Sequence, residues 1–368
     1  MPAMYDAVVI GATISGLTSA LTLARRGVKV VVLDPFPEGA SASVGHGIAT
    51  VVLGDDLAVG RTTDETLLRR LGRVLDAQSF VAELAESHDV PIARMPVTER
   101  TLAHDPRLAA ERRMLVRLGA PVTPVPADSV AGLDLGPGFM VPDQLVVDPD
   151  AYAAALRQAA VKAGVTLIHL VTVTRLRRHR VLYAVHYRSQ LAWEHSMQVE
   201  WAPRVIDTQA TSPWGRHVRQ GQALSVPVVL TSGITLDAVL ALRDTPARLL
   251  RPYRDGVLVV GHPVPPAALE TATLGLRQWV SERLGSPASA TSHYGIEPGS
   301  LENPSEGASP IPGGFWAGGN GLWELARGTA AGLAIARRLL SEPDTEQRLP
   351  AAFRLRASLR RGWQGHSR

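Results

Sequence analysis

Residues 5–38 read YDAVVIGATISGLTSALTLARRGVKVVVLDPFPE. Val8, Val9 and Ile10 form a short apolar run that is typical of a strand buried in a parallel sheet. A turn with two glycines follows over residues 11–16, then a segment with the apolar spacing of a helix, and then a second apolar run over residues 28–33. The stretch therefore predicts a strand, a turn, a helix and a second strand in direct succession.

The turn, and the acid that ends the second strand, match a dinucleotide-binding unit. In such a unit the helix N-terminus binds a pyrophosphate, and a carboxylate about 20 residues further on binds a ribose hydroxyl. Gly11 and Gly16 supply the outer glycines, and Asp34 follows Gly11 by 23 residues. Thr13 stands where the pattern has its middle glycine, at the point of closest approach to phosphate. The stretch predicts nucleotide binding; the alternative is a unit that has kept its shape and lost its ligand.

The composition is that of an ordinary globular protein with more than one domain. The chain has 368 residues, of which 45% are hydrophobic and 20% charged, and this length exceeds the usual size of a single core. The net charge is +4, and the positive charge is almost all arginine, since Lys29 and Lys162 are the only lysines. No basic block with interleaved aromatic residues occurs, which argues against nucleic-acid binding.

Features that the sequence lacks exclude several kinds of chemistry and of binding partner. The chain has no cysteine, which excludes disulfides, cysteine-bound metal and thiol catalysis. The first strand begins within a few residues of the N-terminus, and no apolar run reaches the length of a membrane span. We therefore expect a cytoplasmic protein with no metal, no membrane partner and no nucleic-acid partner. The sequence leaves the oligomeric state open.

The rest of the chain shows helical and strand-like segments around one irregular region. Periodicity predicts helices over residues 64–90, 148–164 and 273–284, and strands over residues 165–173, 181–206 and 257–260. Residues 91–142 are rich in proline and poor in periodicity, so we expect an irregular excursion there. Residues 313–340 predict a short strand, a glycine-rich turn and a final helix.

A series of landmarks follows the N-terminal unit in order. They are the small-residue loop of residues 39–45, the helix opening Val147-Asp148-Pro149, the segments RQGQAL over residues 219–224 and PYRDGVLVVG over residues 252–261, and the C-terminal glycine-rich strand and helix. Together with the first unit they resemble the D-amino-acid oxidase or glycine oxidase superfamily of flavoenzymes, across nearly the whole chain. The resemblance implies an α/β fold with a Rossmann-like FAD-binding domain and a second α+β domain whose antiparallel sheet covers the flavin.

The same resemblance implies a division of the chain. Residues 1–85, 143–222 and 305–345 would form a discontinuous FAD-binding domain. Residues 86–142 and 223–304 would form the substrate-binding domain, and residues 346–368 a C-terminal tail.

FAD is the cofactor that the resemblance implies. The glycine turn and Asp34 would bind its pyrophosphate and adenosine ribose, and Ser41 and Ser43 would lie near the pyrophosphate and the ribityl chain. Residues 45–47 would approach the isoalloxazine ring, and residues 318–322 the other end of the flavin. Without cysteine, a thioether link to the flavin is excluded. The predicted FAD contacts are Gly11, Thr13, Ile14, Ser15, Gly16, Asp34, Pro35, Ser41, Ser43, Gly45, His46, Gly47, Val173, Gly318, Gly319, Asn320, Gly321 and Leu322.

The implied chemistry is hydride transfer from the carbon beside an amine nitrogen to the flavin, followed by hydrolysis of the imine. Relatives carry an arginine before a proline to bind a substrate carboxylate, whereas here Glu297 precedes the proline. Arg251 and Arg327 are candidate replacement cations. Glu297 is a candidate partner for the substrate ammonium group, and His46 could tune the flavin, accept a proton or carry a covalent link. The plainer explanations are surface arginines, a solvent-facing carboxylate and a histidine bonded to backbone.

The sequence thus predicts an FAD-dependent oxidoreductase acting on the C–N bond of an amine, amino acid or N-substituted glycine, in a setting such as bacterial secondary metabolism. Thr13, Glu297 and the altered segment Asp-Thr-Gln-Ala at residues 207–210 depart from the family pattern. They keep open a second hypothesis, a flavin-fold protein without redox activity that serves as a binding or partner subunit. A nicotinamide-linked dehydrogenase is disfavoured, since nothing resembles a second cofactor half.

Overall fold

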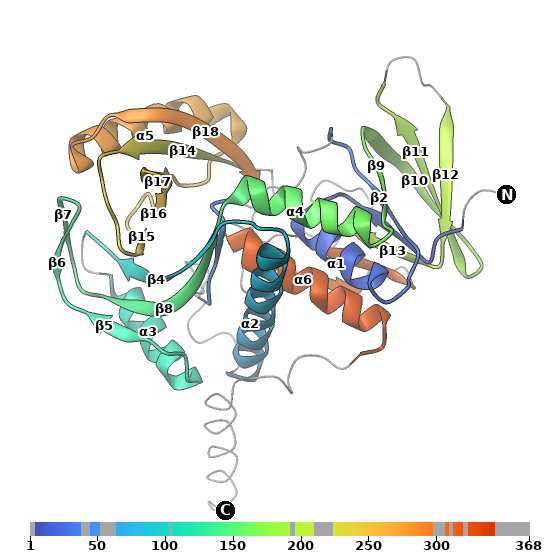
Figure 1. Cartoon of the computed structure of the whole chain (residues 1–368), viewed down its shortest axis with the longest axis horizontal. Helices are drawn as coiled ribbons and strands as arrows, with labels where there is room; N and C mark the ends of the chain where they lie inside the picture. The colour runs from blue at the N-terminus through green and yellow to red at the C-terminus, as the bar shows by residue number, and fades with distance from the viewer. Residues whose placement is uncertain are drawn as a thin grey trace, which may run out of the picture.

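The computed structural model describes residues 4–37, 45–51, 64–102, 105–191, 196–209, 224–296, 306–308, 312–318 and 323–342. Figure 1 shows two sheet-containing halves with a group of helices between them. Among the helices of the described ranges, none has both the length and the apolar character needed to cross a membrane.

The first half is built on a six-stranded sheet that contains the N-terminal strand at its centre. Each strand of this sheet runs parallel to its neighbours, except for one edge strand, which pairs antiparallel with the strand beside it. In order across the sheet, the strands are β19 (Glu306–Ala308), β20 (Gly314–Ala317), β13 (Arg204–Asp207), β1 (Ala7–Ile10), β2 (Val30–Leu33) and β9 (Thr166–Ile168). This is the parallel arrangement that the N-terminal sequence predicts.

Successive residues of the central strands are buried against two different layers. Val9 and Val32 pack in a core formed with the helices, whereas Val8 and Val31 pack against the side chains of a three-stranded antiparallel sheet. The apolar runs are buried on both faces, which explains why they do not alternate with polar residues. The helices are α1 (Ile14–Ala24), α2 (Asp64–Ser87), α4 (Pro149–Lys162) and α6 (Glu324–Leu339), and the three strands are β10 (Val171–His179), β11 (Leu182–Ser189) and β12 (Met197–Ala202).

The second half is a nine-stranded, mainly antiparallel sheet. Its main path runs in the order β18 (Ala288–Ile296), β14 (Leu224–Ser232), β17 (Gly256–Val260), β16 (Arg248–Tyr253), β15 (Val239–Leu242), β4 (Ile92–Arg100), β8 (Gly138–Val147) and β3 (Ile48–Ala49), and β5 (Thr123–Val125) also pairs with β8. Two helices, α3 (Pro106–Leu118) and α5 (Leu269–Leu284), pack on it, and η1 (Pro266–Ala268) precedes α5. A small hairpin joins β6 (Asp128–Val130) to β7 (Leu133–Leu135).

The predicted irregular excursion over residues 91–142 is wrong. The region contains β4, α3 and four further strands, β5 to β8. The pairing of β4 with β8 is interrupted between Met95 and Val97, whose partners are Gln144 and Val141. Pro96 and Pro142 both lie within this interruption, where the sheet needs no backbone donor from them. Two of the prolines that suggested irregular chain therefore mark one bulge in two long strands.

Two other predicted elements have different bounds. Helix α5 begins at Leu269 rather than at residue 273. The single strand expected over residues 165–173 is divided into β9 and β10, which belong to different sheets. The division follows from Leu170, whose φ of 55° turns the chain between them.

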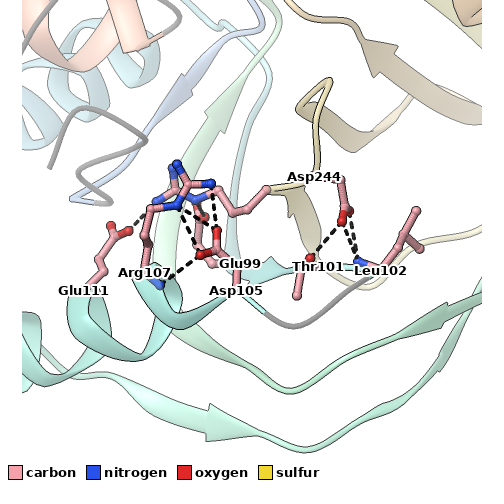
Figure 2. A network of polar contacts seen from close by, with 8 residues as sticks. Glu99, Thr101, Leu102, Asp105, Arg107, Glu111 and Asp244 are labelled. Atoms are coloured by element: carbon pink, nitrogen blue, oxygen red, sulfur yellow. Dashed lines mark hydrogen bonds and ion pairs between the residues drawn. The ribbon is translucent and has the colours of Figure 1, made fainter.

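Buried ion pairs attach helix α3 to the nine-stranded sheet. Arg243, just after β15, contacts the carboxylates of Glu99 in β4 and Glu111 in α3. The next residue, Asp244, accepts hydrogen bonds from the Thr101 hydroxyl at 2.8 Å and from the Leu102 N–H at 2.9 Å (Figure 2). Glu99 and Glu111 are 0% and 2% exposed, so Arg243 is the cation that makes their burial tolerable.

Candidate active site

The glycine turn places the N-terminus of α1 at the carboxyl end of β1. Thr13 is the N-cap residue: its Oγ1 accepts a hydrogen bond from the Gly16 N–H at 3.1 Å and lies 3.1 Å from Ser15 Oγ. The first N–H groups of a helix have no acceptor within the helix, so the start of α1, at Ile14 and Ser15, is the kind of helix end that favours an anion. Thr13, which departs from the glycine pattern, thus stabilises this helix end with its hydroxyl.

The turn has no room for a side chain at its last glycine. A Cβ at Gly16 would lie 2.2 Å from the Gly11 carbonyl oxygen and 2.9 Å from Thr208 Oγ1. Thr208 lies directly after β13. Its Oγ1 is 2.9 Å from each of the carbonyl oxygens of Ile10 and Gly11, to which the hydroxyl donates. The side chain of Gln209 packs against Gly11. Thr208 and Gln209 of the altered segment therefore pack against the glycine turn.

Asp34 ends β2 and is fully buried. Its Oδ2 lies 3.2 Å from His169 Nδ1, and its Oδ1 accepts the Phe36 N–H at 3.5 Å. His169 is absent from the predicted set. It follows β9 directly, and β9 is the parallel neighbour of β2, so the strand order brings both residues to the same edge of the sheet. Pro35 is half-buried in the turn after Asp34.

Val173, another predicted FAD contact, lies in β10. Its side chain is partly buried and packs with the core between the parallel sheet and the three-stranded sheet. A role at the cofactor stays a prediction for this residue.

Arg251 holds residues 45–47 in place from strand β16. Its guanidinium is buried, and its Nη1 donates to the carbonyl oxygen of His46 and, at 3.0 Å, to that of Val147. Gly47 has φ of +70°, and a Cβ there would lie 2.4 Å from the Val147 carbonyl oxygen and 2.9 Å from Arg251 Nη1. The plainer explanation of Arg251 as a surface arginine is wrong, because it is 3% exposed.

His46 lies against the start of the C-terminal helix. Its ring is buried, its Nδ1 accepts the Ile48 N–H at 3.3 Å, and its centroid lies 5.1 Å from that of the Trp323 ring in an edge-to-face arrangement. Trp323 immediately precedes α6. The structure therefore brings His46 of the segment expected at the flavin beside Trp323, the residue that follows the predicted C-terminal turn in the sequence.

Tyr294, in strand β18, is the residue of this region that sequence reasoning missed. Its ring lies 3.4 Å from the place of a Cβ on Gly45, and its hydroxyl 3.7 Å from it. The hydroxyl oxygen is buried and finds no hydrogen-bond partner in the described part of the chain. In this part of the sequence only Glu297 is a predicted site residue. No periodicity in the sequence shows that Tyr294, three residues before it, points toward residue 45.

Burial sets the charge state of both groups near residues 45–47. Burial raises the pKa of Tyr294, the nearby Glu324 raises it further, and Arg251 opposes the shift. Burial lowers the pKa of Arg251 to about 10, an effect that Tyr253, Asp148 and Tyr294 partly offset. At neutral pH the site therefore contains a charged guanidinium beside a neutral phenol.

The remaining predicted residues are placed only in part. Arg327 is half-buried in the first turn of α6, four residues after Trp323, and Gly318 is buried directly after β20. The others lie outside the described residues: Ser41, Ser43, Glu297, Gly319, Asn320, Gly321 and Leu322.

Residues 6–338 match the family described as DAO, FAD dependent oxidoreductase. The chain belongs to this family. It is therefore an FAD-dependent oxidoreductase, which confirms the predicted enzyme class and cofactor. No curated protein sequence matches the chain.

Solved structures similar to this DAO-family chain confirm its fold class. Glycine oxidase from Geobacillus kaustophilus has a TM-score of 0.72 and 16% identity, over 92% of this chain and 95% of that one. L-proline dehydrogenase from P. horikoshii has a TM-score of 0.71 and 13% identity, over 97% and 99%. Iminodiacetate oxidase from Chelativorans sp. BNC1 has a TM-score of 0.68 and 18% identity, over 94% and 97%. At these identities the likeness concerns the fold alone.

The residues of this DAO-family chain fit FAD at the nucleotide end. Glycine at positions 11 and 16 lets the turn pack closely against Thr208 and Gln209, and the N-terminus of α1 lies at the end of this turn. The hydroxyl oxygen of the N-cap residue Thr13 accepts a hydrogen bond from the Gly16 N–H. A pyrophosphate is the group that such a turn and helix end accommodate.

Proposed function

We propose that this enzyme oxidises the C–N bond of an amino acid or N-substituted glycine at a site formed by residues 45–47, Arg251 and Tyr294. The observation that carries the proposal is convergence: Arg251 from β16 and Tyr294 from β18 both approach residues 45–47, which lie beside Trp323 at the start of α6. The folds of glycine oxidase and iminodiacetate oxidase support this class of substrate. A role in secondary metabolism is part of the same proposal.

The chain's own residues would bind and orient the substrate. Arg251 Nε donates to the Pro252 carbonyl oxygen at 3.3 Å and Nη1 to two further carbonyls, while Nη2 has no acceptor among the described residues. Nη2 is thus the group suited to a substrate carboxylate, and the neutral Tyr294 hydroxyl is suited to its second oxygen or to the amine. When bound, FAD would supply the acceptor for the hydride from the carbon beside nitrogen. Gly11, Ile14, Ser15 and Asp34 would hold its nucleotide end.

Anaerobic reduction of the FAD-loaded protein tests the proposal without assuming an electron acceptor. The panel would contain glycine, sarcosine, iminodiacetate, L-proline, D- and L-amino acids, and matched amines without a carboxylate. We expect loss of the visible flavin absorbance with at least one amino acid and none with its carboxylate-free analogue. If dithionite bleaches the flavin and no compound in the panel does, the second hypothesis, a binding or partner subunit, is favoured instead.

Replacing Arg251 by alanine should affect stability as well as substrate binding. The change leaves the buried carbonyls of His46 and Val147 without their donor, and we expect the free energy of unfolding to fall by about 2 kcal/mol. The KM for an anionic substrate should rise together with this loss. Chemical denaturation and steady-state kinetics measure the two effects. Arg254→Ala is the control, since Arg254 also lies over the Tyr253 ring but is exposed. A raised KM at unchanged stability would show that Arg251 acts on the substrate alone.

Replacing Tyr294 by phenylalanine should separate stability from catalysis. Removing a buried hydroxyl that lacks a partner among the described residues is expected to raise the free energy of unfolding by about 1 kcal/mol. Loss of its bond to the substrate should lower kcat/KM by about tenfold, at unchanged flavin content. Tyr253→Phe is the matched control, because the Tyr253 hydroxyl is 3.5 Å from Asp148 Oδ2 rather than at residue 45. Native kcat/KM in Tyr294→Phe would exclude substrate contact by the phenol.

A further inference from the structure

Among the described residues, no helix or strand of another sheet packs on one face of the three-stranded sheet β10–β11–β12. The residues on one face of an antiparallel sheet are those that pair directly and every second one along each strand. Tyr183, Val185 and Tyr187 form the inner face and are buried against the parallel sheet. The opposite face, which we term the outer face, carries Arg175, Arg177, His179, His186, Arg188, Met197, Val199 and Trp201, with Leu182 and Ala184 between them.

The outer face is strongly positive. Arg175, Arg177 and Arg188 are exposed, and none of them has an ion-pair partner among the described residues. The described part of these strands contributes one acid, Glu200, and it lies on the inner face, where its Oε1 accepts from the Tyr187 hydroxyl at 3.1 Å. The charge of this surface is therefore not balanced from within the sheet.

The pKa of His186, at the middle of the outer face, reflects the positive charge around it. Partial burial lowers the pKa of His186, and the charges of Arg177, Arg175 and His179 lower it further. The charged groups that act on it are all cations of this face, namely Arg177, Arg175 and His179. A solvated surface usually mixes the two signs, so a face of one sign indicates attraction of a negatively charged partner.

An apolar row runs beside the cationic one. Met197 is 57% exposed, and Val199 and Trp201 are half-buried along the same strand, with the Trp201 ring 5.3 Å from that of His179. The cationic row on β10 and the apolar row on β12 are two strand spacings apart, roughly 10 Å. That separation is about the diameter of one α-helix with its side chains.

We propose that the outer face is a docking surface for an acidic protein partner, bound through an amphipathic helix with a carboxylate row and an apolar row. Carboxylates four residues apart on a helix are about 6 Å apart, which is close to the roughly 7 Å between alternate arginines on a strand. Arginine, methionine and tryptophan are the residue types enriched in protein–protein interfaces. A second copy of this chain is disfavoured as the occupant, because two outer faces would present like charges to each other.

The surface has no part in the candidate active site. Figure 1 places β10, β11 and β12 at the end of the molecule opposite α5 and the nine-stranded sheet, which supplies Arg251 and Tyr294. Variants of the outer face should consequently leave the catalytic machinery intact, and docking can be measured with the FAD-loaded enzyme.

The experiment measures binding of a fluorescent peptide by anisotropy. The probe is a helix-forming peptide of about 18 residues with glutamates at every fourth position on one face and leucines on the adjacent face. The test variant carries Arg175→Glu, Arg177→Glu and Arg188→Glu. The control variant carries the same charge change at Arg113, Arg277 and Arg283, which are exposed on α3 and α5.

We expect the test variant to bind about tenfold more weakly or worse, the control within about twofold of native, and both to keep native thermal stability. Met197→Ser should weaken binding of the leucine-bearing peptide by about threefold and leave the affinity for an all-glutamate peptide unchanged. No binding to the native protein, or equal loss in test and control variants, would overturn the proposal. So would stronger, equally arginine-dependent binding of short single-stranded DNA or of phosphatidylserine vesicles, since the partner would then be a nucleic acid or a membrane.

Discussion

Gly16→Ala is expected to produce a protein that binds FAD about 100-fold more weakly than the native chain, a loss of about 3 kcal/mol. The added Cβ would lie 2.2 Å from the Gly11 carbonyl oxygen, which is backbone and cannot rotate away. The turn must therefore shift, and with it the N-terminal N–H groups of α1, which are the groups suited to a pyrophosphate. Titration of the apoprotein with FAD, followed by flavin fluorescence, measures the affinity.

A second glycine in a helix provides the control for this substitution. Gly275 lies in α5, and a Cβ there would meet no atom within 4 Å. Gly275→Ala should keep native FAD affinity and raise the free energy of unfolding by about 0.5–1 kcal/mol, because alanine has the higher helix propensity. Native FAD affinity in Gly16→Ala would show that the glycine turn is not where the pyrophosphate binds.

Arg243→Met is expected to lower the free energy of unfolding by about 3–5 kcal/mol. Arg243 is the cation between Glu99 and Glu111, whose carboxylates are almost completely buried. Methionine fills a similar volume but removes the positive charge that faces both carboxylates in a region of low dielectric. Chemical denaturation at neutral pH measures the loss, and α3 should detach from the sheet first, as seen by faster amide hydrogen exchange in residues 106–118.

An exposed ion pair gives the matched control. Arg94 and Asp143 are 3.3 Å apart, with side chains 57% and 67% exposed. Arg94→Met removes an exposed arginine from β4, the strand that also carries Glu99, without leaving a buried charge, and should cost less than about 1 kcal/mol. A loss in Arg243→Met no larger than this would mean that the two glutamates gain access to water.

Local patterns in the sequence predicted the parts of the fold that local forces decide. The apolar run at Val8, Val9 and Ile10, the outer glycines of the turn and the Asp148-Pro149 helix start each reflect contacts among residues close in the chain. These elements lie where the sequence indicates, apart from their ends. The order of the landmarks added the family, and with it FAD.

The candidate site could be predicted only in outline. The sequence offers Arg251 as a cation, but its hydrogen bonds to the carbonyls of His46 and Val147 join residues 205 and 104 positions apart, respectively. Tyr294 meets Gly45 for the same kind of reason, because β18 is a distant strand of the same sheet. Thr13 departs from the glycine pattern, and its role is explained by a hydrogen bond to the N–H of Gly16, three positions further along the chain.

The sequence by itself determined that an N-terminal strand, turn and helix form, that Gly11 and Gly16 are the outer glycines of that turn, and that the chemistry belongs to an FAD-dependent family. These properties depend on dihedral preferences, side-chain spacing and close backbone approach within a few residues. Only the tertiary structure decided which side chains share the space beside residues 45–47, that Asp34 meets His169, and that the arginines of β10 and β11 form one cationic face. Such groupings depend on sheet order and register, which are set by packing over the whole chain and leave no periodic mark in the sequence.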